Sequence, residues 1–225
     1  MGKRQETREK IETQIIELGR RHLVTEGAAG LSLRAIARDL GMVSSAVYRY
    51  VANRDDLLTL LLVDAYSELA DAVDRAGATS GSWRDRLLAT AHAARGWAID
   101  QPASWALLYG SPVPGYRAPR ERTVGPGTRV VGAMFNAIAA GIAAGDIPQS
   151  NVAAAQPLSS DFERVRQEFE FTGNDSAVAK CFLLWAGLVG AISLEVFGQY
   201  GADTLTEPGA VFDTQVRLLI DMLSG

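Results

Sequence analysis

The sequence predicts an all-α protein with a small N-terminal domain and a larger C-terminal domain. Apolar residues recur with the 3.6-residue spacing of helices through most of the 225 residues, and no segment shows the alternation typical of a strand. The charge is divided along the chain. Residues 1–54 contain ten Lys/Arg and six Asp/Glu, a net charge of +4, whereas the remainder carries −8. A basic head on an acidic body can bind a polyanion, because ionic contacts are local at physiological salt.

Three helices are expected in the first domain, which we place at residues 1–54. The first, Thr7–Thr25, has an apolar stripe that starts at Ile11. Ser32 is a good N-cap for the second, since its hydroxyl can accept a backbone hydrogen bond. Gly41 can then adopt the positive φ of a tight turn. The second and third helices are expected at Leu33–Leu40 and Ser44–Val51.

Residues 55–225 predict a second helical domain, interrupted by breaks rich in Gly, Pro and Ser. Asn53 is expected to cap its first helix, with Asp55 and Asp56 near the positive end of the dipole. The expected helices are Arg54–Ala76, Trp83–Asp100, Ala103–Tyr109, Arg129–Ala144, Asp161–Phe169, Ser176–Tyr200 and Pro208–Leu223. The expected loops are Gly77–Ser82, Gly110–Gly127 and Ile147–Pro157.

Composition argues against a membrane or secreted protein. The richest apolar stretch, Phe182–Phe197, contains Glu195 and is shorter than the ~18–20 uncharged residues of a membrane span, so it predicts a buried helix. The charged N-terminus lacks the apolar core of a signal peptide. Cys181 is the only cysteine, which excludes an intramolecular disulfide and a thiolate metal cluster. We expect a cytoplasmic protein with no membrane association, cofactor or metal.

An enzyme is the main alternative class. The two histidines, His22 and His92, do not belong to a Ser-His-Asp order, and the chain has no nucleophile elbow, Walker loop or Gly-x-Gly-x-x-Gly after a strand. The acidic residues around His92 lack the spacing of metal ligands. We therefore expect no catalytic residues.

Two short helices joined at Gly41 within a basic segment predict a helix-turn-helix over residues 32–50. Its first helix needs an apolar inner face, which is centred on Ile36. Its second helix needs small residues at its start, to enter the major groove, and inward-facing anchors such as Val47 and Val51. Outward-facing side chains must reach phosphates or base edges with hydroxyls or a guanidinium. The candidates are Ser44, Ser45, Tyr48, Arg49 and Tyr50.

Residues 31–58 resemble the N-terminal domain of tetracycline-repressor (TetR) family regulators. The similarity is carried by LRAIARDLG at 33–41, YRYV at 48–51 and NRDDLL at 53–58. Two positions depart from the family pattern: Val43 stands where Ser or Thr is usual, and Val51 where Phe is usual. The resemblance implies a DNA-binding transcriptional regulator, with repression favoured. A transcriptional activator is the alternative, and a small-molecule-binding helical protein or an enzyme is a remote one.

The same resemblance implies roles for single residues. Tyr48 and Tyr50 would contact the sugar-phosphate backbone, with packing against the head's core as an open alternative for Tyr50. Arg54 would hold a phosphate together with a helix N-terminus. A solvated helix face is the alternative for Arg34. The residues expected at the groove are Arg34, Ser44, Ser45 and Arg49. A flexible arm is expected from Lys3, Arg4 and Arg8.

Family members join this head to a helical body that dimerises and binds a small ligand. The helix around Trp185 resembles a subgroup in which His-Gly follows the tryptophan, although the histidine position is Val189 here. Large aromatic side chains with few charges suit a small apolar effector, while an ordinary core is the alternative for each of them. The expected ligand-binding residues are Trp97, Trp105, Tyr109, Met134, Phe135 and Trp185.

The last two helices are the expected homodimer interface. Small residues such as Gly187 and Gly190 permit close approach, and Val216 and Leu219 supply apolar area. Two-fold symmetry would then imply a pseudo-palindromic operator in double-stranded DNA. Glu195 in the apolar helix either pairs with an arginine or faces the ligand.

Overall fold

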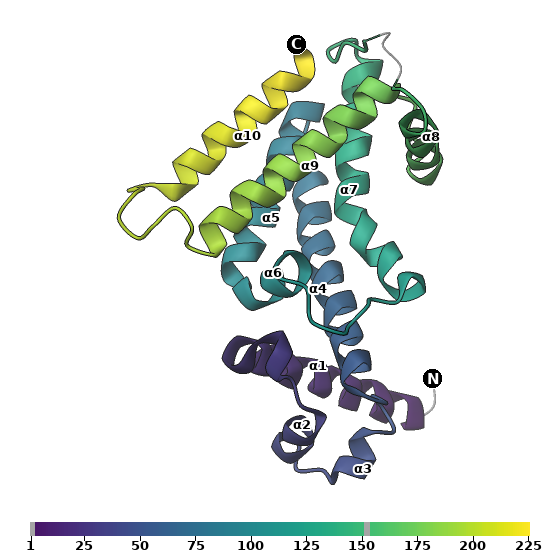
Figure 1. The fold of residues 1–225 in the computed structure, drawn as a ribbon, viewed down its shortest axis with the longest axis vertical. Helices are drawn as coiled ribbons and strands as arrows, with labels where there is room; N and C mark the ends of the chain where they lie inside the picture. The colour runs from purple at the N-terminus through teal and green to yellow at the C-terminus, as the bar shows by residue number, and fades with distance from the viewer. Residues whose placement is uncertain (1–2, 151–153) are drawn as a thin grey trace. The chain divides into compact units, whose positions relative to one another are not determined.

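The computed structural model describes residues 3–150 and 154–225, and within these residues all regular secondary structure is helical (Figure 1). The predicted all-α class is therefore confirmed. In chain order the helices are α1 (Lys3–Gly30), α2 (Leu33–Asp39), α3 (Ser44–Val47), α4 (Arg54–Gly77), α5 (Trp83–Asp100), α6 (Pro102–Tyr109), α7 (Arg120–Ala143), α8 (Leu158–Glu168), α9 (Asp175–Val196) and α10 (Pro208–Ser224).

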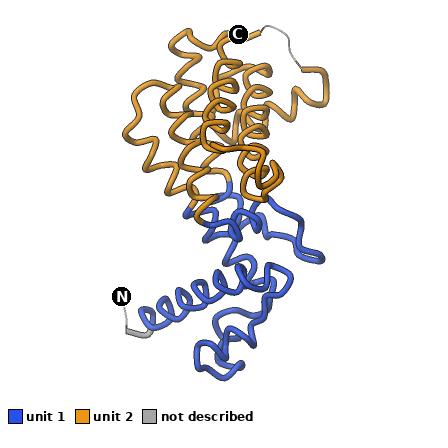
Figure 2. Tube along the Cα trace, turned by 90° about the vertical axis from the view of Figure 1, so that its left-hand side faces the viewer, with its two compact units in different colours: residues 1–68, 101–127 blue, residues 69–100, 128–225 orange. Residues whose placement is uncertain are grey.

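The chain divides into two compact units (Figure 2). Unit 1 comprises residues 1–68 and 101–127, and unit 2 comprises residues 69–100 and 128–225. This division differs from the boundary expected after residue 54. The physical reason is tertiary packing: Leu107 of α6, and Val113 and Tyr116 after it, lie against the apolar core of the N-terminal helices.

The core of the head is formed by the inward faces of α1 to α4. Val47 and Val51 are both fully buried, which confirms them as the inward anchors of the helix-turn-helix. The Ser32 side chain accepts a hydrogen bond from the Ala35 N–H at 3.5 Å and caps α2 as predicted. Gly41 has φ +67°, the left-handed conformation that the turn requires. Asn53 caps α4 as predicted: its Oδ1 accepts from the Asp56 N–H at 2.9 Å.

Two helix boundaries within the N-terminal domain differ from the prediction. α1 begins at Lys3, so the expected flexible arm is wrong for the backbone, while the side chains of Lys3 and Arg4 lie outside the described residues. α3 ends at Val47, and the residues that follow form a tighter turn in which the Tyr50 N–H donates to the Val47 carbonyl at 2.9 Å. The N-cap of α3 is Val43, which makes no side-chain capping bond.

The loop predicted over Gly110–Gly127 is wrong for its last eight residues, because α7 already begins at Arg120. The Pro119 carbonyl accepts from the Arg122 and Thr123 N–H groups at 3.1 Å, and from the Thr123 hydroxyl at 2.9 Å. These bonds fasten the first turn. Pro126 lies inside the helix, where it removes one backbone donor without ending the helix.

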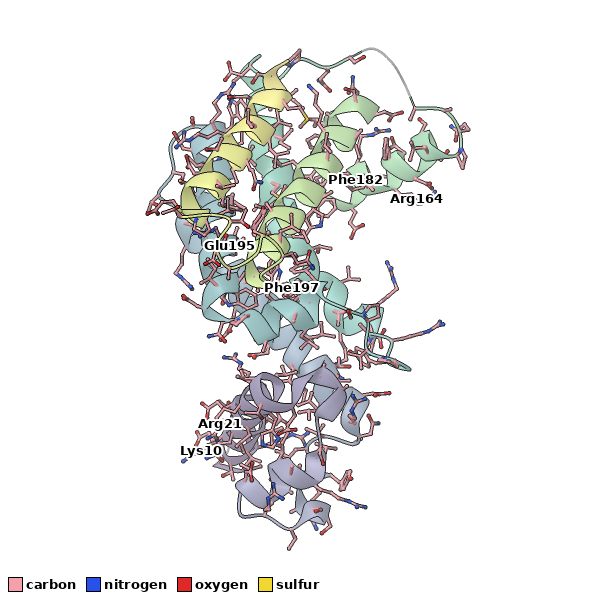
Figure 3. All side chains as sticks on the ribbon, turned by 60° about the vertical axis from the view of Figure 1, so that its left-hand side comes forward. Lys10, Arg21, Arg164, Phe182, Glu195 and Phe197 are labelled. Atoms are coloured by element: carbon pink, nitrogen blue, oxygen red, sulfur yellow. The ribbon has the colours of Figure 1, made fainter. Side chains whose placement is uncertain are left out.

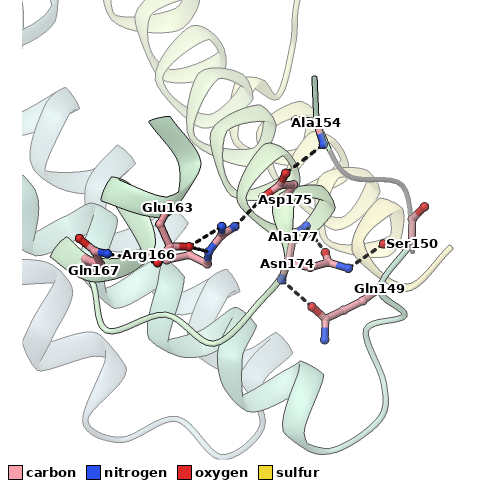
Figure 4. Close-up of polar contacts among 9 residues, drawn as sticks. All are labelled: Gln149, Ser150, Ala154, Glu163, Arg166, Gln167, Asn174, Asp175 and Ala177. Carbon is pink, nitrogen blue, oxygen red and sulfur yellow. Dashed lines mark hydrogen bonds and ion pairs between the residues drawn. The ribbon is translucent and has the colours of Figure 1, made fainter. Parts of the chain in front are cut away.

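In unit 2, α8 is fastened to the start of α9 (Figure 4). Arg166 Nη1 lies 2.6 Å from Asp175 Oδ1, and Asp175 Oδ2 accepts from the Ala154 N–H at 2.9 Å. The Arg166 guanidinium holds the pKa of Asp175 below its usual value. Asn174 caps α9 by accepting from the Ala177 N–H at 3.1 Å. These polar contacts hold α8 against the start of α9.

α9 is long and apolar enough, by length and composition alone, to cross a membrane, with a mean hydropathy of 1.9 over its most apolar window. Within unit 2 it packs against α5, α8 and α10. Val178, Cys181 and Ile192 on its inner face are at most 1% exposed. A core helix meets the same criterion, so a single helix of this kind is weak support for a membrane span. α9 ends at Val196, before the predicted Tyr200.

Candidate nucleic-acid interface

The turn between α2 and α3 presents polar side chains on a rigid apolar support. Ser45 and Arg49 are exposed, Tyr48 is 45% exposed and Ser44 is half-buried, while Val47 between them is fully buried. A helix that buries one face and leaves hydroxyls and a guanidinium on the other can approach a DNA groove without disturbing its own core.

The described basic side chains of the head fall into two groups. In the first group the charge is used internally; for example, Arg20 Nε donates to Asp64 Oδ2 at 2.6 Å and Arg20 Nη1 lies 2.7 Å from Glu68 Oε1. In the second group the side chain has no ion pair or hydrogen bond with any described residue. This group comprises Lys10, Arg21, Arg34 and Arg49, of which Figure 3 labels the two on α1. Their charge is available to a phosphate.

Arg54 has an internal role that its sequence position did not indicate. Its Nη2 donates to the carbonyl oxygens of Ala28 at 2.7 Å and Ala29 at 3.1 Å, near the end of α1. Cationic side chains stabilise the carbonyl end of a helix. Nε and Nη1 remain without a partner among the described residues.

Residues 41–50, which comprise the turn after α2, α3 and the turn that follows it, are called the recognition turn below. Its two tyrosines are in different environments. Tyr48 is 45% exposed, whereas Tyr50 packs against the core of the head. Packing is the alternative that the sequence left open for Tyr50. The guanidinium carbon of Arg8 lies 5.8 Å from the centroid of the Tyr50 ring, within the range of a cation–π contact. Arg8 thus links the start of α1 to the end of the recognition turn.

The start of α4 is held by contacts with distant residues that the sequence analysis did not identify. Arg122 Nη1 lies 2.9 Å from Asp56 Oδ1, and Asp56 Oδ2 accepts from the Ala52 N–H at 3.3 Å. Thr59, which is 1% exposed, has its hydroxyl 2.9 Å from that of Tyr116. Arg122 and Tyr116 lie 66 and 57 residues along the chain from their partners, in a Pro-rich segment without periodicity, so no local pattern could have identified them.

Four of the expected ligand-binding residues belong to unit 2. Met134 and Phe135 of α7 are buried, and Trp185 of α9 is half-buried. The Phe135 ring stacks on Phe169 with 4.7 Å between centroids, so it is part of an aromatic cluster. Trp97 of α5 is half-buried, and its indole N–H is buried without an acceptor among the described residues.

The other two expected ligand-binding residues, Trp105 and Tyr109 of α6, belong to unit 1. Trp105 is 1% exposed and lies 4.4 Å from Tyr109 between ring centroids; Tyr109 meets Tyr66 edge-on at 6.5 Å. Burial raises the pKa of Tyr109.

Glu195 is paired with an arginine. Arg95 Nε donates to Glu195 Oε2 at 2.7 Å, and Arg95 Nη2 donates to Oε1 at 2.5 Å (Figure 3 labels Glu195). The side chains are 21% and 16% exposed, and the two-pronged geometry is the strong form of the Arg–carboxylate contact. The pairing alternative is therefore confirmed.

An apolar groove of about 480 Å³ runs between α9 and α10. Leu183 and Leu218 on these helices are 52% and 65% exposed. The groove is lined by Ala186, Gly187, Gly190, Ala191, Leu194, Gln215, Leu218 and Leu219. In contrast, the described residues contain no group of three or more His, Cys, Asp or Glu side chains that could hold a metal ion.

Comparison with known proteins identifies the class. Residues 87–219 match the family described as "Tetracyclin repressor-like, C-terminal domain". HTH-type transcriptional regulators of Mycobacterium tuberculosis and Mycobacterium bovis are 69% identical to the chain over 226 residues, which covers 100% of this chain and 97% of each relative. The chain therefore belongs to the TetR family of transcriptional regulators, which bind DNA and are not enzymes.

Solved structures agree on the fold. The crystal structure of a regulatory protein with 30% identity has a TM-score of 0.79 and covers 98% of this chain and 100% of its own. The transcriptional regulator FadR from Bacillus subtilis, solved in complex with stearoyl-CoA, has a TM-score of 0.65 at 11% identity and covers 91% of this chain and 97% of its own. At that identity the likeness concerns the fold alone.

Proposed function

We propose that the protein is a repressor that binds a pseudo-palindromic operator in double-stranded DNA and is released by a small apolar effector. The observation that carries this proposal is the exposed Arg49, which has no partner among the described residues and follows Ser45 on a turn anchored by the buried Val47. A guanidinium on a rigid support can donate two hydrogen bonds to a guanine edge. The relatives named above are transcriptional regulators, which is consistent with this role.

Each candidate residue has a proposed contact. Ser45 and Arg49 reach base edges, with Arg34 and Ser44 beside them at the groove. Tyr48 donates its hydroxyl to a phosphate. Arg54 retains its bonds to the end of α1 and offers Nε and Nη1 to a phosphate near the start of α4. Tyr50 supports the turn by packing, and its hydroxyl contacts the DNA backbone.

The proposed assembly is a homodimer through α9 and α10. The groove of about 480 Å³ exposes glycine and leucine surfaces that water solvates poorly. Gly187 and Gly190 would let a second copy's helices approach closely. A two-fold axis here would present two recognition turns to two half-sites about one helical turn, ~34–36 Å, apart or at a multiple of that spacing.

The proposed effector is small and predominantly apolar. The six expected ligand-binding residues are large and uncharged, and burial of apolar surface would supply the affinity. FadR, which shares the fold, was solved in complex with stearoyl-CoA, a ligand that has a long apolar acyl chain on a polyanionic coenzyme A; the acyl chain is the part comparable with the proposed effector. We also place the chain in the subgroup with a tryptophan at position 185, with Val189 replacing the histidine.

Repression requires that the effector favour a conformation with lower operator affinity. A reporter gene placed behind the operator separates this mechanism from activation: deletion of the regulator should raise expression if it represses and lower it if it activates.

Because the operator is chromosomal DNA, the proposed location is the cytoplasm.

The direct test replaces Tyr48 and Arg49 by alanine in the full-length protein. The DNA is a duplex enriched from a random-sequence pool by the unaltered protein. We expect the double variant to lose specific binding in a gel shift while its thermal unfolding is unchanged. Arg164→Ala, an exposed arginine of α8 (Figure 3), is the matched control and should bind normally. Retained binding by the double variant would overturn the assignment.

A further inference from the structure

Val43 contributes little to the folding of the head, although it occupies a structurally important position. It is the N-cap of α3, with extended backbone angles of φ −68° and ψ 141°. N-caps are usually Ser, Thr, Asp or Asn, because an oxygen on the side chain can accept from a free N–H of the first turn. The Val43 side chain makes no such bond, and it is 71% exposed. It neither caps the helix nor enters the core.

The surroundings of Val43 indicate where its exposed apolar side chain could be buried. Among the described residues of unit 1, the large apolar side chains that are highly exposed are Val24, Val43 and Tyr48. Two of the three lie on the recognition turn: Val43 is two residues before the exposed Ser45, and Tyr48 directly precedes the exposed Arg49. The first residues of a recognition helix are those that contact base edges. An isopropyl group there can gain stability only when it loses contact with water.

We propose that Val43 packs against the 5-methyl group of a thymine in each half-site of the operator, an inference that rests on the proposed DNA-binding role of α3. Among the four bases, thymine alone presents a methyl group in the major groove. Contact removes both apolar groups from water. Burial of one methyl group corresponds to about a fourfold change in affinity, so Val43 selects thymine over other bases at one position.

The test pairs a protein methyl with a DNA methyl. Operator duplexes are selected by the full-length protein from a random pool, and each selected thymine of one half-site is replaced in turn by uracil, which removes the 5-methyl group and leaves base pairing unchanged. We expect one replacement to weaken binding about fourfold. Val43→Ala should bind the thymine and uracil duplexes equally well.

Two further variants control for stability and for exposed valines in general. Val24→Ala removes a 72% exposed valine from α1 and should retain the fourfold preference for thymine. Val43→Thr restores a capping hydroxyl and should raise the melting temperature while reducing the preference.

Three outcomes would overturn the inference. A selected operator without thymine in its half-sites, or one insensitive to uracil, eliminates the contact but leaves DNA binding intact. The same uracil effect in Val43→Ala assigns the methyl contact to another residue. Failure to select any sequence overturns the proposed function itself, and the contact with it.

Discussion

The recognition turn of unit 1 and the α5–α9–α10 region of unit 2 use charged side chains in opposite ways. Arg49 of the recognition turn and Arg34 of the preceding α2 are exposed and without a partner among the described residues. In unit 2, Arg95 donates to the Glu195 carboxylate. The Asp213 carboxylate has Oδ2 2.7 Å from Arg217 Nε and Oδ1 3.1 Å from His92 Nε2. A charge that is to bind a polyanion must stay hydrated and mobile until binding. The partly buried Arg95 and Glu195 have lost most of their hydration, so each depends on the other as its counter-ion, whereas the more exposed Asp213 contacts are weaker.

The largest effect on stability is expected from the Arg95–Glu195 pair. Glu195→Ala leaves a largely buried guanidinium without its acceptor, so the free energy of unfolding should fall by about 2–4 kcal/mol. Chemical denaturation monitored by circular dichroism measures it. Asp221→Ala breaks the exposed pair with Arg84 and should cost less than about 1 kcal/mol. Equal losses in the two variants would show that burial of the pair is irrelevant.

In the recognition turn the pattern should reverse, with a large effect on binding and little on folding. Arg49→Ala should weaken operator binding by about 1–3 kcal/mol, because a base-edge contact is lost. Its unfolding free energy should change by less than about 0.5 kcal/mol, as for other exposed side chains. Fluorescence anisotropy and denaturation measure the two quantities on one sample. A stability loss as large as the binding loss would contradict the comparison.

A smaller effect should come from Arg122, whose contact with Asp56 holds the start of α4 directly after the recognition turn. Arg122→Gln should reduce operator affinity by about two- to fivefold, since a half-exposed pair contributes up to about 1 kcal/mol. Arg129→Gln is the control in the same helix, because Arg129 pairs with Asp71 and Asp74 instead. If the double variant Asp56→Arg with Arg122→Asp restores the affinity, the ion pair acts by holding the start of α4 in place.

The smallest change is expected at Cys181. Burial raises the pKa of its thiol to about 12, so at pH 8 very little reactive thiolate is present. In the folded protein the thiol should react with a disulfide reagent far more slowly than after denaturation. Stopped-flow absorbance measures both rates. Comparable rates in the two states would mean that the core around α9 opens freely.

Local features were readable from the sequence because their causes lie within one or two helical turns. The Ser32 and Asn53 caps, the Gly41 turn and the buried anchors Val47 and Val51 follow from side-chain chemistry and 3.6-residue spacing. The glycine-rich end of the first helix also behaves as its composition indicates: Gly27 has φ +67° and ψ 173°, which kinks α1 at that residue. The start of α7 differs from the prediction, because Pro126 and its neighbouring glycines lie inside a helix that continues through them.

The sequence by itself determined an all-helical chain, the caps and turn of a helix-turn-helix and its buried anchors, since periodicity and capping act locally. Only the tertiary structure decided three pairings. Arg54 donates to carbonyls at the end of α1, Arg122 pairs with Asp56, and Arg95 donates to Glu195. Each of these contacts joins residues 25 to 100 positions apart. Their partners are chosen by how helices pack, because no local pattern records which distant side chain will meet a charge.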